Sequence, residues 1–168
     1  MTRDLHWLGT AIFADMRSNI YLKSKLLLIM YRLSNYLYSK GFFGKLFGAP
    51  IIIFYNFSGW FLGIEIPAKT NIGKPFILMH GVGLVVNADS IIGDNVIMRQ
   101  GCCVGNKINI DGSFSAAPVI GNNVEFGANS QVIGPVTVAD DVKIGSGAVV
   151  VKNCESGKIY VGVPAKPI

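Results

Sequence analysis

Aliphatic side chains return at every sixth residue through the second part of the chain, and this period is its strongest pattern. An amphipathic helix repeats its apolar positions about every 3.6 residues and a half-buried strand every second residue, so neither explains a period of six. Repeats of six are typical of a parallel β-helix, in which each short strand forms one side of a triangular coil and points its aliphatic side chain inward. The series is Ile66, Ile72, Leu78, Val86, Ile92, Met98, Val104, Ile120, Phe126, Val132, Val138, Ile144 and Val150.

Small residues accompany this series at two fixed places. Glycine often follows the aliphatic residue directly, which eases the backbone turn at a coil corner. A β-sandwich would have to hold the same phase by chance over six consecutive repeats, so we predict the β-helix. The glycines are Gly73, Gly93, Gly105, Gly121, Gly127 and Gly145, and the small or β-branched residues at the fifth place are Val96, Val124, Ser130, Val142 and Ala148.

Two interruptions break the period, and each predicts a departure from the regular coil. A two-residue offset in MHGVGLVV, residues 79–86, indicates a loop or bulge that contains His80. The stretch NKINIDGSFSAAP, residues 106–118, is too polar and glycine-bearing for a coil side, so we expect a projecting loop. Functional residues commonly gather on such insertions.

Residues 1–63 follow a different pattern, and we expect them to form a helical segment ahead of a β-helix domain at 64–168. Apolar residues at helical spacing over 21–37 predict an amphipathic helix with interleaved basic residues. A second apolar stretch, LFGAPIIIFYNFSGWFLGI, predicts another helix with Pro50 near its first turn, where a missing N–H is tolerated. The stretch has the length of a membrane span, but its proline, glycines and polar residues favour a packed or interfacial helix.

Composition and charge change this picture in two ways. Hydrophobic residues make up 51% of the 168 residues and charged residues only 15%, which predicts that part of the surface is buried against another subunit or a membrane. Residues 1–63 carry the whole net charge of +5, with seven Lys or Arg against two Asp, whereas 64–168 have eight of each sign. The repeats therefore lack the basic stripe of a nucleic-acid site, and no such partner is expected. At the cytoplasmic face of a membrane, the residues expected to meet anionic head groups are Lys23, Lys25, Arg32, Lys40 and Lys45.

The cysteines and the first residues indicate the compartment. Cys102, Cys103 and Cys154 form no C-x-x-C pair and are expected as small buried residues in a reducing environment. The opening MTRDLHWLGTAIF lacks the basic-then-apolar pattern and cleavage site of a signal peptide. We therefore expect a cytoplasmic protein.

Only two histidines occur, His6 and His80. His6 has no motif around it and is expected on the surface of a frayed N-terminus. His80 lies in HGVG at a break in the repeat, a position that leaves a structural and a catalytic role open. One histidine in the repeats cannot supply the three ligands of a trimeric β-helix carbonic anhydrase, so no metal site is expected.

The stretch from Glu65 to the C-terminus resembles the catalytic domain of serine acetyltransferases. The resemblance rests on EIPAKTNIGKPFILMHGVG (residues 65–83), on the unbroken hexapeptides from Ile120 and on the closing GVPAK. It implies a left-handed parallel β-helix and an enzyme that moves an acetyl group from acetyl-coenzyme A to a hydroxyl. In that family a carboxylate before the first coil pairs with the histidine of an H-x-x-G element, and these positions fall on Glu65 and His80.

The chemistry that this resemblance implies is general-base catalysis. A neutral imidazole takes the proton of the hydroxyl as it attacks the thioester, and a carboxylate fixes the tautomer and stabilises the imidazolium. Glu65 is longer than the family's aspartate, and an unpaired solvent-facing acid is an equally good interpretation of it. A backbone N–H near Gly105 is a candidate donor to the oxyanion.

Positions that recognise the amino acid in serine acetyltransferases are uncharged in this chain. That family has an aspartate before the histidine and an Arg-His pair before the proline that reopens the repeats, where this chain has Met79, Ala116 and Ala117. Because the ends of a free amino acid need charged partners, the acceptor is predicted to be a neutral alcohol. The pattern resembles serine acetyltransferase-like O-acetyltransferases of exopolysaccharide synthesis, which implies a saccharide acceptor, free or lipid-linked. The candidate acceptor-binding residues are Met79, Asn106, Asp111, Phe114 and Ala117.

In the same family coenzyme A lies in the groove between neighbouring β-helices, which implies a homotrimer. Lysines would meet its phosphates as point charges. The positions for acetyl-coenzyme A are Gly105, Gly127, Ala128, Lys143, Ser146, Val163, Pro164 and Lys166. Two alternatives stay open: a serine acetyltransferase of cysteine biosynthesis with altered recognition residues, and a non-catalytic trimeric β-helix scaffold.

Overall fold

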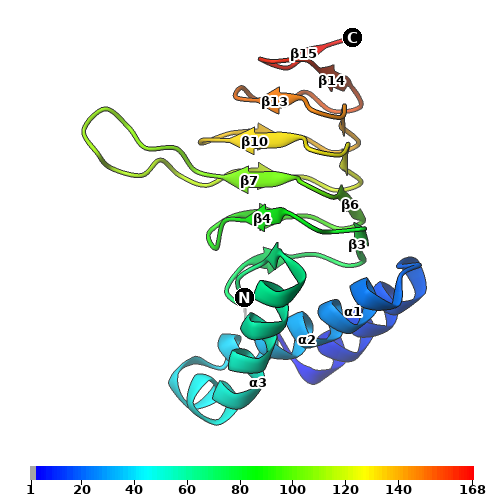
Figure 1. The fold of residues 1–168 in the computed structure, drawn as a ribbon, viewed down its shortest axis with the longest axis vertical. Helices are drawn as coiled ribbons and strands as arrows, with labels where there is room; N and C mark the ends of the chain where they lie inside the picture. Colours follow the sequence, from blue (N-terminus) through cyan, green and yellow to red (C-terminus); the bar gives the residue numbers. More distant parts are fainter. Residues whose placement is uncertain (1–2) are drawn as a thin grey trace.

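The structure is a computed structural model that describes residues 3–168. Three helices form the base of the molecule, and a stack of short strands rises from them (Figure 1). The helices are α1 (Leu5–Ser18), α2 (Leu22–Ser39) and α3 (Gly41–Leu62). No helix within residues 3–168 combines the length and the apolar character needed to cross a membrane.

The strands form three sheets, one on each side of the coil, and every pair is parallel except β14 with β15. Sheet A contains, in spatial order, β1 (Ile64–Glu65), β4 (Leu84–Val86), β7 (Cys103–Gly105), β10 (Gln131–Ile133) and β13 (Val149–Val150). Sheet B contains β2 (Asn71–Ile72), β5 (Ile91–Ile92), β8 (Val119–Ile120) and β11 (Thr137–Val138). Sheet C contains β3 (Phe76–Met79), β6 (Val96–Arg99), β9 (Glu125–Phe126), β12 (Lys143–Ile144), β14 (Ile159–Val161) and β15 (Lys166–Pro167).

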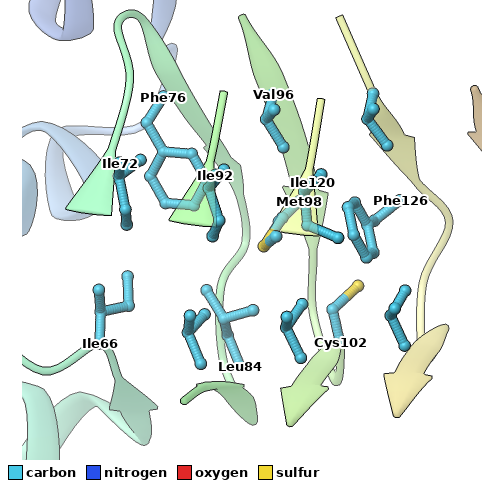
Figure 2. Close-up of a cluster of buried hydrophobic side chains, with 14 of the residues drawn as sticks. Ile66, Ile72, Phe76, Leu84, Ile92, Val96, Met98, Cys102, Ile120 and Phe126 are labelled. Atoms are coloured by element: carbon cyan, nitrogen blue, oxygen red, sulfur yellow. The ribbon is translucent and has the colours of Figure 1, made fainter. Parts of the chain in front are cut away.

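The inward side chains of the three sheets form one continuous core (Figure 2). In sheet B, for example, Ile72, Ile92 and Ile120 stack in register from one coil to the next. All thirteen residues of the period-six series are buried, each with 3% or less of its surface exposed. The predicted parallel β-helix is therefore confirmed. The period of six arises because each side of the coil has one residue of this series that points inward.

Successive coils approach so closely at one corner that only glycine fits there. A Cβ on Gly93 would lie 2.6 Å from the carbonyl oxygen of Gly121 in the next coil. A Cβ on Gly73 would lie equally close to Gly93. Gly73 and Gly93 thus have a steric cause, which is the contact between backbones of neighbouring coils.

The helices close the lower end of the β-helix by bonding to its first coil. A coil with no neighbour below it leaves backbone N–H and C=O groups without strand partners. Tyr31 donates its hydroxyl to the carbonyl of Thr70 at 2.7 Å, and Arg32 donates to the carbonyls of Ile72 and Gly73 at 2.8 and 2.6 Å. These bonds cover the lower edge of sheet B.

The lower edge of sheet C is covered in the same way from the junction of α1 and α2. Asn19 donates to the carbonyl of Phe76 and accepts from the N–H of Leu78, both at 2.8 Å. Ser24 donates to the carbonyl of Leu78 at 2.9 Å. The side chains of the helical segment therefore provide the hydrogen bonds that the backbone of another coil would otherwise make.

A buried ion pair stabilises this cap. Arg32 and Asp15 lie 2.7 Å apart, with 0% and 2% of their side chains exposed, and Asp15 also accepts from the N–H of Phe76 at 2.8 Å. The expectation that Arg32 faces lipid head groups is wrong, because Asp15 and two backbone carbonyls satisfy its guanidinium inside the protein.

The helices differ from the sequence-based prediction in two further respects. Pro50 lies in the interior of α3 rather than in its first turn, because α3 already begins at Gly41, with only Lys40 between it and α2. Gly41 has a left-handed φ of 73°, which lets the chain reverse between the two helices. His6 is exposed as expected, but it lies in the first turn of α1, where the carboxylate of Asp4 accepts from the N–H of Trp7 at 2.6 Å.

Candidate active site

His80 stands on a tight turn between β3 and β4. Its backbone has a left-handed φ of 69°, and Gly81 and Gly83 take positive φ values of 59° and 75°. The N–H of Val82 donates back to the carbonyl of His80 at 2.8 Å. Left-handed backbone is uncommon for residues other than glycine and is often found at functional sites. The turn leaves His80 exposed while Leu78 and Leu84 on either side of it are buried.

The imidazole of His80 contacts Tyr21, a residue that the sequence interpretation placed only on the apolar face of a helix. The hydroxyl of Tyr21 lies 3.1 Å from Nε2, and the two ring centroids are 4.5 Å apart. Tyr21 immediately precedes α2 and sits between Asn19 and Ser24, whose bonds to β3 fix this junction. No motif or spacing connects two residues 59 positions apart, so the sequence held no signal for this contact.

Glu65 lies on β1 with its side chain exposed, opposite Val85 of β4. It lines a cavity of about 510 Å³ between α3 and the first strands of sheet A, together with Tyr55, Trp60 and Leu84. Within residues 3–168 no hydrogen bond joins Glu65 to His80, whose ring is bonded to Tyr21. The catalytic pairing of Glu65 with His80 therefore stays a prediction.

Four turns lead from sheet C to sheet A, residues 80–83, 100–102, 127–130 and 145–148, and they stack on one another with His80 in the lowest. Residues 162–164, which join β14 to β15 within sheet C, follow above them, and we call these five segments the corner column. Backbone bonds link its levels, from Gly101 N to Val82 O, from Asn129 N to Gln100 O and from Gly147 N to Ala128 O, each at 2.9 Å. The N–H of Val149 then reaches the carbonyl of Gly162 at 3.0 Å.

Five of the positions proposed for acetyl-coenzyme A lie on this column: Gly127, Ala128, Ser146, Val163 and Pro164. Lys143 and Lys166 stand beside it on β12 and β15, both exposed. With strands about 4.8 Å apart, three steps from β3 to β12 separate His80 from Ser146 by roughly 14 Å. The column is thus a continuous track for an elongated ligand, with the histidine at its foot.

Gly105 and the loop 106–118 lie at the other edge of sheet A. His80 precedes β4, whereas Gly105 ends β7 and the loop follows it. Parallel strands of one sheet all begin on the same side and all end on the opposite side. The length of the strands of sheet A therefore separates Gly105 and the loop from the histidine. The structure therefore does not bring Asn106, Asp111, Phe114 or Ala117 beside His80 of the same chain.

The loop itself projects far from the coil (Figure 1). Ile108 and Phe114 form an antiparallel bridge across its two limbs, and the ring of Phe114 is 69% exposed. The hydroxyl and the N–H of Ser113 donate to Asp111, which lowers the pKa of this carboxyl from its ordinary value. The loop thus presents an ionised carboxylate and an unpacked aromatic ring at a distance from its own coil.

The cation that lies opposite Met79 in sheet C is already bound within the chain. Met79 pairs in register with Arg99 of β6. The guanidinium of Arg99 lies 2.8 Å from the carboxylate of Glu125 and 3.3 Å from the carbonyl of Phe126. The charge of Arg99 is therefore already paired within its own chain. Among residues 3–168 no cluster of three His, Cys, Asp or Glu side chains could hold a metal ion.

Known proteins match this chain over the repeats and over nearly its whole length. Residues 117–152 match the family model for the bacterial transferase hexapeptide with six repeats. WcaB of Escherichia coli K12, named as a colanic acid biosynthesis acetyltransferase, is 31% identical over 157 residues, which cover 90% of this chain and 95% of WcaB. A serine acetyltransferase of Helicobacter pylori is 35% identical over 141 residues, covering 84% of this chain and 78% of that protein.

Solved structures of serine acetyltransferases share the fold. The soybean apoenzyme matches with a TM-score of 0.83 and 22% identity, over 96% of this chain and 69% of that one. A serine acetyltransferase in complex with CoA matches with a TM-score of 0.72 and 24% identity, over 89% of this chain and 58% of that one. The two relatives above show that the chain belongs to the hexapeptide-repeat acetyltransferases, the family of WcaB and the serine acetyltransferases.

Proposed function

We propose that this protein transfers the acetyl group of acetyl-coenzyme A to a hydroxyl of a saccharide, with His80 as general base. The observation that carries the proposal is the position of His80 at the foot of the corner column. Five of the residues assigned to the donor line the levels above it, and Lys143 and Lys166 flank them. A donor lying along the column would bring its thioester down to the imidazole.

The reaction needs one proton transfer and one exchange of bonds at the acetyl carbon. His80 accepts the proton of the acceptor hydroxyl while the oxygen attacks the thioester carbonyl and the new C–O bond forms. The tetrahedral intermediate collapses with cleavage of the C–S bond, and the imidazolium returns the proton to the departing thiolate. Tyr21 holds the ring through Nε2. Glu65 is the proposed carboxylate partner of the base.

The acceptor is proposed to be neutral because the positions that recognise the amino acid in serine acetyltransferases hold no free charge in this chain. Met79 precedes the histidine, Arg99 is bound to Glu125, and Ala116 and Ala117 end the projecting loop. Binding two charged groups without partners costs several kcal/mol, which amounts to roughly three decades in turnover. The similarity to WcaB supports a saccharide, whereas the similarity to the Helicobacter pylori enzyme supports serine as the second candidate.

A homotrimer is part of this proposal. The loop with Asp111 and Phe114 lies across sheet A from its own histidine, so it completes the acceptor site only when it projects from a neighbouring subunit. A cyclic trimer of parallel β-helices places such surfaces side by side. We further propose that the trimer sits at the cytoplasmic face of a membrane, because the helical segment is basic and exposes many apolar side chains.

The experiment that tests the function measures release of free thiol from acetyl-coenzyme A. L-serine and oligosaccharide or glycan fractions of the source organism serve as acceptors, and mass spectrometry locates the acetyl group. We expect turnover with a glycan fraction and at least three decades less with serine. Efficient acetylation of serine with none of any glycan would assign the protein to the second candidate function.

A further inference from the structure

An open apolar groove of about 690 Å³ runs between α2 and α3. Apart from Lys23 and Ser58, every residue that lines it is aliphatic, aromatic or methionine. Leu26 from α2 and Phe57 and Phe61 from α3 are 55%, 59% and 77% exposed. Its size is within the range of about 300–1,000 Å³ of small-molecule sites, and exposed apolar surface of this extent marks an interaction site.

The groove ends beside the candidate active site. Leu22, at its α2 end, directly follows Tyr21, whose hydroxyl contacts His80. Leu62, at its α3 end, lies three residues before Glu65. A ligand in the groove would therefore reach the helix junction from which Tyr21 meets the histidine.

The charge around the groove favours an anionic amphiphile. Residues 22–62 contain no Asp or Glu and five basic residues, of which four remain once the buried Arg32 is set aside with its partner Asp15. Lys23 lines the groove at the end next to Tyr21, and Lys25 follows within the same turn of α2. A second copy of this chain packed by two-fold symmetry would bring the same basic residues against each other, which is unfavourable. A hydrocarbon chain with a phosphate at its head fits both the apolar walls and the lysines.

We propose that this groove binds the hydrocarbon chain of a saccharide acceptor linked to a lipid phosphate. The chain lies between α2 and α3, the phosphate meets Lys23, and the saccharide extends past Tyr21 to His80. The proposal rests on the proposed function, because it names the carrier on which the acceptor arrives.

Direct binding tests it without turnover. Dodecyl phosphate, below its micelle concentration, is titrated into the full-length protein by isothermal calorimetry. Dodecyl maltoside tests the hydrocarbon chain without the phosphate, and inorganic phosphate tests the phosphate without the hydrocarbon chain. We expect saturable binding of dodecyl phosphate, at least tenfold weaker binding of dodecyl maltoside and none of inorganic phosphate. Leu26→Glu and Phe57→Glu should each raise the Kd at least tenfold, and Lys23→Ala at least threefold.

Phe47→Glu is the matched control, since Phe47 is 78% exposed on α3 but does not line the groove. It should change the Kd less than twofold. All substituted side chains other than Lys23 are more than half exposed, so circular dichroism should show the native fold in each variant.

Three results would overturn the lipid site: no saturable binding, equal loss of binding in the control, or a change of oligomeric mass in Leu26→Glu and Phe57→Glu with the Kd unaltered, which would indicate a second copy. Acetylation of free glycans by a protein that binds no dodecyl phosphate would remove this proposal and leave the proposed function standing. Tight binding with no glycan acetylated would remove the proposed function and leave the groove a lipid site.

Discussion

The phenol oxygen of Tyr21 lies 3.1 Å from Nε2 of His80, across 59 positions of the chain. This contact joins the helical base to the foot of the corner column, so the helices take part in the candidate site. When Nε2 carries the ring proton, it donates to Tyr21 and leaves Nδ1 free to act as the base. In that tautomer Tyr21 is a positioning residue that holds the ring through Nε2, and the proposed partner Glu65 stabilises the imidazolium by its charge without a hydrogen bond to the ring.

Replacing His80 by Asn should remove the base and leave the fold intact. We expect kcat to fall by about two to four decades, the usual contribution of general-base catalysis, with coenzyme A affinity unchanged. Glu65→Gln should lower kcat less, because it removes only a partner of the base. Thiol release measures both, and near-normal turnover of His80→Asn would refute the mechanism.

Tyr21→Phe should lower kcat about two- to tenfold. The substitution deletes one hydrogen bond, with a net contribution of about 0.5–1.5 kcal/mol, and keeps the ring that packs on the imidazole. The KM for acetyl-coenzyme A should not change, since the donor track lies on other residues. A rise in kcat would show instead that the hydroxyl of Tyr21 competes with the acceptor for Nε2.

Two inactive variants should restore activity when their subunits are mixed. His80→Asn lacks the base, whereas the double variant Asp111→Ala and Phe114→Ala lacks the loop side chains. If each site combines one subunit's histidine with its neighbour's loop, random hybrid trimers regain both in roughly one quarter of their sites. The assay is thiol release after unfolding and co-refolding of an equimolar mixture. An active monomer by light scattering, or no recovery in proven hybrids, would exclude the shared site.

Arg32→Met should destabilise the protein by about 3–5 kcal/mol, because it leaves the carboxylate of Asp15 buried without its partner. It also removes the donor to the carbonyls of Ile72 and Gly73. Arg17→Met is the matched control, since Arg17 is exposed on α1. This substitution should change the free energy of unfolding by no more than about 0.5 kcal/mol. Urea unfolding gives both values, and equal stability of the two variants would contradict the role of the pair.

The thiol of Cys154 should react slowly in the native protein. Burial raises its pKa to about 11, and the thiolate is the reactive form, so at pH 8 little of it is available. Labelling by Ellman's reagent, located by mass spectrometry, should speed up about tenfold per pH unit until the pH approaches 11. In guanidinium chloride the site should react at the rate of an ordinary cysteine. Rapid labelling of the folded protein at pH 8 would contradict this.

The sequence predicted the β-helix well because its core obeys a local rule. Each coil side needs one inward apolar residue, so positions such as Ile92 and Ile120 show their burial through spacing alone. The glycines beside them are likewise explained by contact between consecutive coils. Spacing also identified His80, since the break that places it on a turn interrupts the same period.

The remaining features depend on contacts that spacing does not encode. Arg32 looks like any basic residue of an amphipathic helix, and only its approach to Asp15 and the first coil reveals a buried charge. Tyr21 is hidden for the same reason, because its partner belongs to another element. The projecting loop at 106–118 was predicted from its composition. Its separation from His80 was not, because it depends on the histidine standing before a strand of sheet A and the loop standing after one.

The junction at residues 19–24 has a consequence for how this protein can evolve. Asn19 and Ser24 hold the first strand of sheet C, and Tyr21 between them holds the imidazole. A lineage that exchanged its N-terminal helices for another segment would lose two things in the same step. It would lose the side chains that bond to the first coil of the β-helix and the tyrosine that contacts the proposed catalytic histidine. Recombination at the apparent boundary near Gly63 is therefore disfavoured, and new acceptor preferences would arise by substitutions within the helices rather than by shuffling them.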